Sequence, residues 1–441
     1  MHLLCLITLL LLSCAPASLF AAPGDAAKEF TLDNGLKVLF VEDHKGPLAT
    51  FQIWYRVGSR DEPSGKSGMS HLLEHMMFKG TLKHSSKEFT GIIQRNGGTD
   101  NAHTTKDYTM YHQSLPSDKI GLSVVLEADR MKNLLLDPRE VESEQKVVME
   151  ERRMRYEDDP QNALYELVVA TALKAHPYRR PVIGWMSDIA SIEHTDLRRH
   201  YVTYYSPENA FIVVAGDVNP EALLPNIRES FGAVSPSISQ IRRTVSVEPE
   251  QRGEKRVRLK KEAELPFVII AYPVPSFPQE DSFALEVLST LLSDGKSSRL
   301  YRTLVYDQRI ALNAFADYSG LSRDPFLFVL GGTAAPGKGA EDLEKGILAE
   351  IQKVLKSPPT EREIQKAKNQ IEAAFVFAQD STYSRALYTG LFEMLGNWRL
   401  METYLDGVRK VTGEDLVRVA EKYFSDDRRT VGILVPVKVS P

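Results

Sequence analysis

The sequence is short of several features, and each shortage excludes a class of protein. It has only two cysteines in 441 residues, Cys5 and Cys14, and both lie close to the N-terminus. A chain cleaved after that point has no cysteine, which excludes disulfides, thiolate zinc sites and cysteine nucleophiles. Any metal ligand must therefore come from histidine, aspartate or glutamate.

The chain also has no excess of positive charge and no long apolar run beyond its N-terminus. Its 54 Lys and Arg residues against 59 Asp and Glu give a formal net charge of -5, and the two signs are interspersed. Nucleic acid is therefore not an expected partner. No later stretch approaches the roughly 20 apolar residues of a membrane helix, so we expect no transmembrane span in the mature chain.

Residues 1–24 are predicted to be a signal peptide. Leu3 to Leu12 is an almost unbroken apolar run, and small residues follow it. This pattern predicts export, to the periplasm in a bacterium. Two alternatives stay open. The segment lacks Lys and Arg before the apolar run, which leaves an uncleaved anchor as one alternative, and the residues before Cys14 loosely resemble a lipoprotein cleavage box.

An internal repeat predicts two similar domains. A helix, a short turn and a strand recur at a constant offset of 219 residues, pairing Tyr204 with Tyr423 and Phe211 with Thr430. Both halves therefore end in similar units. The polar segment 235–255 is the predicted linker between an N-terminal domain, residues 25–234, and a C-terminal domain, residues 256–441.

His71, Glu74 and His75 form a His-x-x-Glu-His motif on a helix predicted over residues 70–78. Histidines at i and i+4 lie about 6 Å apart along one helix face, so both rings could bind one zinc ion. Glu74 flanks that face, where a general base would stand. The alternative is a pair of ordinary structural histidines, although an accidental match is rare, on the order of one in a hundred chains with this many histidines.

Residues 68–81 resemble the active-site helix of the pitrilysin, insulin-degrading enzyme and mitochondrial processing peptidase family of zinc metallopeptidases, the inverzincins. Residues 101–104 and 295–301 resemble two further segments of that family. The resemblance spans nearly the whole mature chain, at the length of the short two-domain bacterial members. It implies an α+β fold of two similar repeated domains, each a mostly antiparallel sheet packed with helices.

The resemblance also implies further site residues. The family's third zinc ligand is a glutamate about 76 residues after the second histidine, which is Glu151 here, giving one Zn²⁺ per chain. Glu144 resembles an auxiliary glutamate and is expected to orient a ligand or the water. Glu150 is the rival for Glu151, and a solvated acidic helix face is the alternative for this region. The edge strand expected to pair with substrate includes three residues, Asn101, Ala102 and His103.

The second half departs from the family pattern. No histidine follows His200, so the C-terminal domain is predicted to be metal-free. The family offers the substrate an Arg and a Tyr seven residues apart, but the strand expected over residues 326–333 has neither. Arg299 and Tyr306 have the spacing but fall in a preceding helix. We therefore predict a dimer, with the hypothesis that a histidine-less homologous subunit supplies the Arg/Tyr pair.

These patterns together predict an exported zinc-dependent endopeptidase that hydrolyses peptides or unfolded polypeptide segments by metal-activated water. A site enclosed between two domains would exclude folded proteins. The alternative is a non-catalytic scaffold or assembly subunit that retains the peptidase fold. A third interpretation, a zinc-buffering protein, would bind the metal without turnover.

Overall fold

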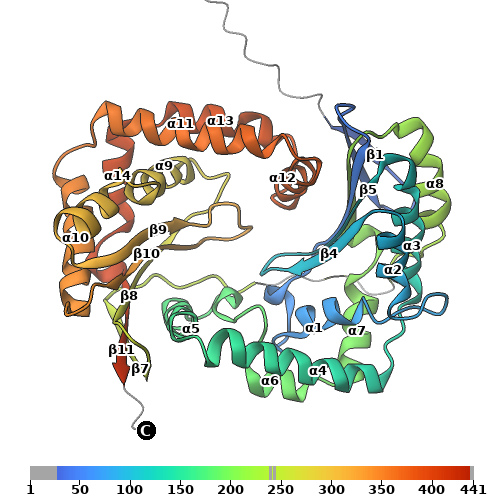
Figure 1. Ribbon diagram of the computed structural model, residues 1–441, viewed down its shortest axis with the longest axis horizontal. Helices are drawn as coiled ribbons and strands as arrows, with labels where there is room; N and C mark the ends of the chain where they lie inside the picture. Colours follow the sequence, from blue (N-terminus) through green and yellow to red (C-terminus); the bar gives the residue numbers. More distant parts are fainter. Residues whose placement is uncertain (1–26, 238–240, 242–244, 438–441) are drawn as a thin grey trace, which may run out of the picture.

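The computed structural model describes residues 27–237, 241 and 245–437. The predicted signal peptide and both cysteines lie outside the described residues. These residues form one six-stranded and one five-stranded sheet. Each sheet is covered by helices, and the two sheets stand apart with their edges toward each other (Figure 1). In the described part of the chain, no helix has the length and apolar character required to cross a membrane.

The first half holds a six-stranded sheet in the order β1-β2-β6-β3-β5-β4. Its strands are β1 (Lys28–Thr31), β2 (Lys37–Glu42), β3 (Leu48–Tyr55), β4 (Thr99–Thr104), β5 (Thr109–Pro116) and β6 (Ala210–Gly216). Its helices are α1 (Met69–Met76), α2 (Glu88–Arg95), α3 (Gly121–Asn133), α4 (Pro138–Arg152), α5 (Pro160–Ala172), α6 (Met186–Ser191), α7 (His194–Tyr204) and α8 (Pro220–Gly232).

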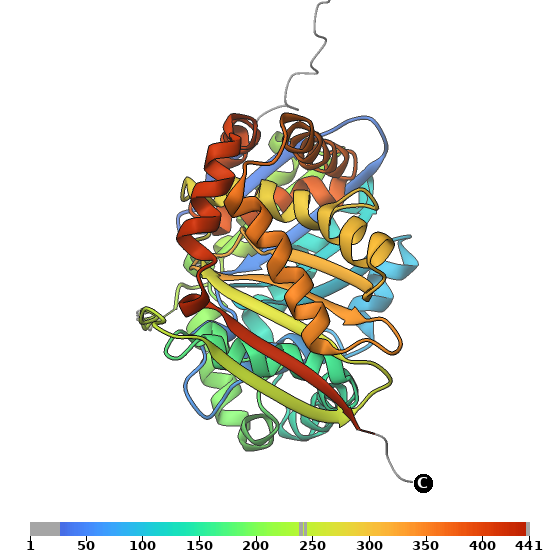
Figure 2. The same cartoon turned by 90° about the vertical axis from the view of Figure 1, so that its left-hand side faces the viewer.

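The second half holds a five-stranded sheet in the order β7-β11-β8-β10-β9, and Figure 2 shows β11 lying between β7 and β8. Its strands are β7 (Lys255–Glu262), β8 (Phe267–Val274), β9 (Ala311–Tyr318), β10 (Phe326–Ala334) and β11 (Thr430–Val437). Its helices are α9 (Asp281–Ser293), α10 (Ala340–Lys356), α11 (Glu361–Ala378), α12 (Thr382–Met394), α13 (Leu400–Lys410) and α14 (Gly413–Tyr423).

The two sheets share one topology. Each sheet has one parallel pairing, β2 with β6 and β7 with β11, and the pairings that follow it in the strand order are antiparallel. Helix α7 and α14 share bounds at the predicted offset of 219 residues, as do β3 and β8. The predicted α+β fold of two similar repeated units is therefore confirmed. The exact domain limits stay a prediction, and the described residues of 235–254 contain no helix or strand.

Each half contributes one helix to the other half. Helix α5 packs on β7, β8 and β11 of the second sheet, while α12 packs on β3 and β6 of the first. The apolar cluster under α12 joins Trp54 and Phe211 to Met394 and Trp398, although these residues lie far apart in the chain. The two halves are thus joined by apolar clusters as well as by the chain.

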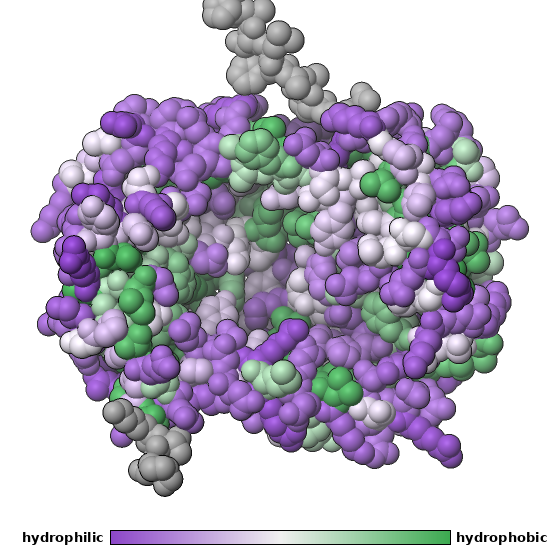
Figure 3. All heavy atoms as spheres, viewed as in Figure 1, coloured by the Kyte–Doolittle hydropathy of each residue, from purple (hydrophilic) through white to green (hydrophobic). Residues whose placement is uncertain are grey.

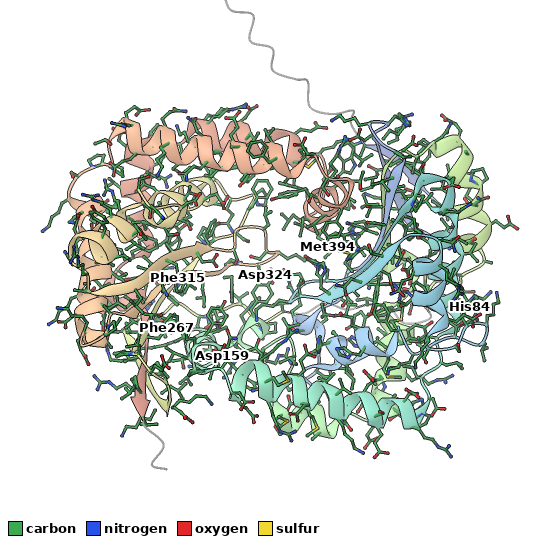
Figure 4. All side chains as sticks on the ribbon, in the orientation of Figure 1. His84, Asp159, Phe267, Phe315, Asp324 and Met394 are labelled. Atoms are coloured by element: carbon green, nitrogen blue, oxygen red, sulfur yellow. The ribbon has the colours of Figure 1, made fainter. Side chains whose placement is uncertain are left out.

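Ion pairs reinforce this junction. Glu393 on α12 is buried and pairs with Arg56 at 2.8 Å and Lys37 at 2.9 Å. At the opposite side, Asp324 after β9 pairs with Arg60 and lies 2.9 Å from His176 (Figure 4). The face between the two halves is hollowed, and polar and apolar side chains line the hollow (Figure 3).

Replacing Gly390 with alanine is expected to destabilise the junction. A Cβ there would lie 2.3 Å from the buried Trp54 ring, a rigid neighbour that cannot move aside. Overpacking of this kind costs about 1–3 kcal/mol, more than the roughly 1 kcal/mol that alanine adds to a helix. The measurement is the free energy of unfolding in urea. Gly121→Ala is the matched control, because a Cβ on that helical glycine meets nothing within 4 Å. Equal changes in the two variants would contradict the prediction.

Candidate metal centre

Helix α1 is fixed in place at its N-terminus and along its apolar side. Its apolar side, with Leu72 and Leu73 fully buried, packs into the core of the first half. The carboxylate of Glu62 accepts hydrogen bonds from the backbone N–H groups of Gly68 and Ser70 at 2.9 and 2.7 Å. These contacts satisfy donors that the first turn of a helix leaves unpaired. The remaining side of the helix presents the three polar residues of the motif.

The structure brings the three predicted ligands together. Nε2 of His71 lies 3.8 Å and Nε2 of His75 lies 3.6 Å from Oε2 of Glu151, which comes from helix α4. The candidate ligand atoms all lie within 4.8 Å of one another. Donor atoms bound to one tetrahedral zinc at about 2.0–2.2 Å would lie about 3.4 Å apart. Two imidazoles and one carboxylate at this spacing fit a zinc ion.

Burial sets the protonation of this cluster. Burial, together with the charges of the neighbouring His75 and Arg155, lowers the pKa of His71 to about 3. A neutral imidazole is the form that binds a metal. Burial also raises the pKa of Glu74, an effect to which the charge of Glu151 adds, while a hydrogen bond from Thr104 opposes it. A carboxylate with a raised pKa is better matched to proton transfer near neutral pH.

A second set of side chains holds the cluster. Oε2 of Glu144 lies 3.1 Å from Nδ1 of His75, and Lys79 pairs with the other oxygen of that carboxylate. Nη2 of Arg155 lies 2.9 Å from Oε1 of Glu151. The outer oxygens of both glutamates are therefore fixed, which orients the inner oxygens toward the histidines.

The structure distinguishes Glu151 from Glu150, the alternative candidate for the third ligand. The side chain of Glu150 is 62% exposed and pairs with Arg153 at 2.7 Å, away from the histidines. Adjacent residues on a helix point about 100° apart, so only one of them can face the cluster. Among the described residues, those of the second half contribute no ligand to any metal-binding group of this kind.

The predicted substrate-pairing residues lie on β4, an edge strand. Asn101, Ala102 and His103 pair with β5 on one side, and no strand among the described residues pairs with the other side. Strand β4 contacts helix α1, and Oγ1 of Thr104 at its end donates a hydrogen bond of 2.5 Å to Oε2 of Glu74. The edge thus lies next to the cluster, while substrate pairing itself stays a prediction.

Three residues that contact the site were not predicted from the sequence: Lys79, Thr104 and Arg155. Arg155 is four residues after Glu151, a helical spacing that could have indicated the ion pair. Thr104 directly follows the predicted edge residues. Its contact with Glu74 depends on how two distant elements pack, and the sequence carries no signal for that.

The Arg and Tyr of the second half lie where the sequence placed them, outside β10. Arg299 is held by Glu363 of helix α11, with bonds of 2.7 and 3.0 Å. Tyr306 lies in a short π-helix, is 59% exposed, and stacks against Arg302 at 4.4 Å. Neither has a contact with the metal cluster.

The repeated two-sheet fold and the cluster on α1 define a protein of the zinc-peptidase-like type. Residues 37–185 match the family model "Insulinase (Peptidase family M16)", and residues 191–371 match "Peptidase M16 inactive domain". The chain belongs to peptidase family M16, which confirms the resemblance found in the sequence.

Relatives support the same assignment. The zinc protease PqqE of Helicobacter pylori is 36% identical over 417 residues, covering 92% of each chain. The crystal structure of a protease from Helicobacter pylori matches with a TM-score of 0.90 and 34% identity, over 93% of this chain and 100% of that one. The periplasmic protease PqqL of Escherichia coli matches at 18% identity with a TM-score of 0.77, over 95% of this chain and 49% of that one, which shows the fold alone.

Proposed function

We propose that this protein is an exported zinc-dependent endopeptidase that hydrolyses peptides or unfolded polypeptide segments. The observation that carries the proposal is the convergence of His71, His75 and Glu151, with Glu74 beside them but not among the three ligands. These three residues would hold one zinc ion per chain. When bound, zinc polarises the peptide carbonyl as a Lewis acid.

The chain's own residues supply the remaining chemistry. Glu74 takes a proton from the attacking water and delivers it to the leaving nitrogen. Thr104 holds one oxygen of that carboxylate and so fixes its orientation. Glu144 holds the ring of His75 in the same way. The free edge of β4 would hold an extended peptide by main-chain hydrogen bonds, which read the backbone more than the side chains.

The position of the site supports a choice of unfolded substrates. Helix α1 and strand β4 face the space between the two halves (Figure 1). The contacts of α5 and α12 hold these two halves together. A folded domain would have to enter the hollow between these halves to reach the cluster (Figure 3). An extended segment needs less room to do so.

Zinc analysis combined with a quenched fluorescent peptide library tests this function. We expect about one zinc per chain, hydrolysis that stops on addition of a chelator, and recovery when zinc is returned. Hydrolysis that continues at the same rate in the presence of the chelator would overturn the metal assignment. Bound zinc without hydrolysis, alone or with a homologous partner, would favour the scaffold or zinc-buffering alternatives.

The proposed partner is a homologous subunit that lacks the histidines and carries the Arg/Tyr pair. The engagement of Arg299 by Glu363 supports this, because Arg299 would have to break that pair to serve a substrate. The matches to models and structures of inactive M16 domains are consistent with paired subunits. Turnover by the chain alone should rise when such a subunit is added. Full activity in isolation would remove the need for it.

Export to the periplasm is proposed from the N-terminal sequence, and the periplasmic name of one structural neighbour is consistent with it. Fractionation of a bacterial host expressing the full chain tests this. Periplasmic protein that has lost residues 1–24 is expected, and protein confined to the cytoplasm would contradict the proposal.

A further inference from the structure

A pocket separate from the metal cluster lies in the C-terminal half, among helices α9, α11, α12 and α13 and the turn after β9. Its volume is about 330 Å³. Six residues define its character: Glu286, Tyr318, Phe375, Tyr388, Phe392 and Tyr404. Helix α12 and the turn after β9 both border the hollow between the two halves (Figures 1 and 3).

Glu286 is the unusual member of this pocket. Among the described residues its carboxylate has neither a hydrogen-bond donor nor a basic partner. Other enclosed carboxylates of this half are paired: Asp281 with Arg418 and Lys422, and Glu344 with Arg256. Glu286 is partly buried at the pocket wall, and a carboxylate without a partner loses hydration there, so its retention indicates a ligand that pairs with it.

The charge of the pocket has one sign. Its lining includes Glu286 and Asp294 but no Lys or Arg. Burial, with the nearby charge of Asp317, raises the pKa of Glu286 to about 7. A neighbouring pocket behind α13 differs, because Lys410 and Arg418 stand in its wall beside the acidic residues there. The pocket at Glu286 therefore offers a negative charge that no Lys or Arg of its own lining offsets.

The walls of the pocket are aromatic. The ring of Phe375 lies 5.5 Å from those of Tyr388 and Tyr404, and Phe392 lies 5.8 Å from Tyr404. The hydroxyl groups of Tyr388 and Tyr404 make no hydrogen bond within the described residues. Aromatic faces attract organic cations, and the attraction grows when the cation is desolvated.

We propose that this pocket binds an organic cation, the ammonium or guanidinium end of a lysine or arginine side chain or of a free amine. The cation pairs with Glu286, its alkyl stem lies against the aromatic walls, and the free tyrosine hydroxyls accept its remaining hydrogen bonds. A basic residue of a peptide is the occupant if the proposed peptidase function holds. Binding itself requires neither zinc nor Glu74.

Calorimetric titration of the full-length chain, in the presence of a chelator, tests the site. The probes are Nα-acetyl-lysine methylamide, its norleucine isostere and n-butylamine. The lysine probe should bind at least tenfold more tightly than norleucine. Binding of n-butylamine as tight as that of the lysine probe would assign the site to free amines, and weaker binding would assign it to peptide side chains. Equal binding of lysine and norleucine, or none, would overturn the proposal.

Glu286→Gln tests the role of the carboxylate. This isosteric change should abolish the preference for lysine over norleucine. Glu229→Gln on the exposed face of α8 is the matched control and should keep the preference. A preference that survives Glu286→Gln would contradict the assignment. The chelator separates this result from the peptidase function, since failure of one leaves the other untouched.

The same variant has an expected effect on stability. The raised pKa of Glu286 means that the folded chain holds this proton more tightly than the unfolded chain between pH 4.5 and about 7. The contribution of Glu286 to stability therefore falls as the pH rises through that window. The groups facing it, Asp294, Asp317 and Tyr404, add no positive charge that would offset this. Urea unfolding should show Glu286→Gln gaining stability relative to the wild type from pH 4.5 to 7, and a constant difference would contradict this.

Discussion

Glu74→Gln is expected to keep zinc bound and to lower kcat for peptide hydrolysis by about 10²- to 10⁴-fold, the contribution typical of a general acid–base group. The amide keeps the shape of the side chain and can still accept the hydrogen bond of Thr104. It cannot take a proton from water. Because Glu74 is not one of the three converging ligands, the metal content should not change.

The measurement is kcat on a peptide cleaved by the wild type, together with zinc per chain by atomic absorption. Glu142→Gln is the matched control, since Glu142 is exposed on helix α4 and pairs only with Lys146. A Glu74→Gln variant with wild-type kcat would remove Glu74 from the chemistry. Loss of zinc in that variant would make Glu74 a ligand instead.

Glu151→Gln and Glu150→Gln, at adjacent positions, are expected to differ sharply in zinc affinity. Loss of an outer residue that orients a ligand commonly costs 10- to 100-fold in metal affinity, so loss of the Glu151 ligand should cost more than about 100-fold. Glu150 pairs with Arg153 on the exposed face and should be replaceable without effect. Hydrolysis at limiting zinc should fall in parallel with affinity for Glu151→Gln.

Competition against a chromogenic chelator measures both zinc affinities under the same conditions. The two variants remove the same charge from the same helix, so a general electrostatic effect would move them together. Zinc loss in Glu150→Gln alone would show that α4 is rotated relative to the arrangement described above.

Local spacing predicted part of this site, and packing decided the rest. The i, i+3 and i+4 spacing of His71, Glu74 and His75 places them on one helix side whatever the fold. Glu151 came only from a family resemblance, because no local rule links residues on two helices 76 positions apart. The choice between Glu150 and Glu151 needed the rotation of α4, which its contacts with α1 and α6 determine.

The fold, like the site, was predicted from the sequence only in part. Repeated patterns predicted two alike units, and the offset found at Tyr204 and Tyr423 holds for entire helices and strands. The same patterns gave no sign that α5 and α12 would each cover the sheet of the other half. Contacts such as the hydrogen bond of Gln52 to the carbonyl of Tyr383 join residues 331 positions apart. Amphipathic periodicity shows that a helix has an apolar face but does not show which sheet will bury it.

Helices α5 and α12 each pack on the sheet of the other half. The connecting segment 235–255 therefore contributes less to holding the halves together than its position suggests. Each half has a core of its own, yet each also leaves an apolar sheet face that only the other half covers. A cut in the connection would therefore yield two fragments that remain associated and retain the metal ligands in place. Cohesion of the finished molecule resides mainly in its two crossed helices and the apolar clusters that they bury.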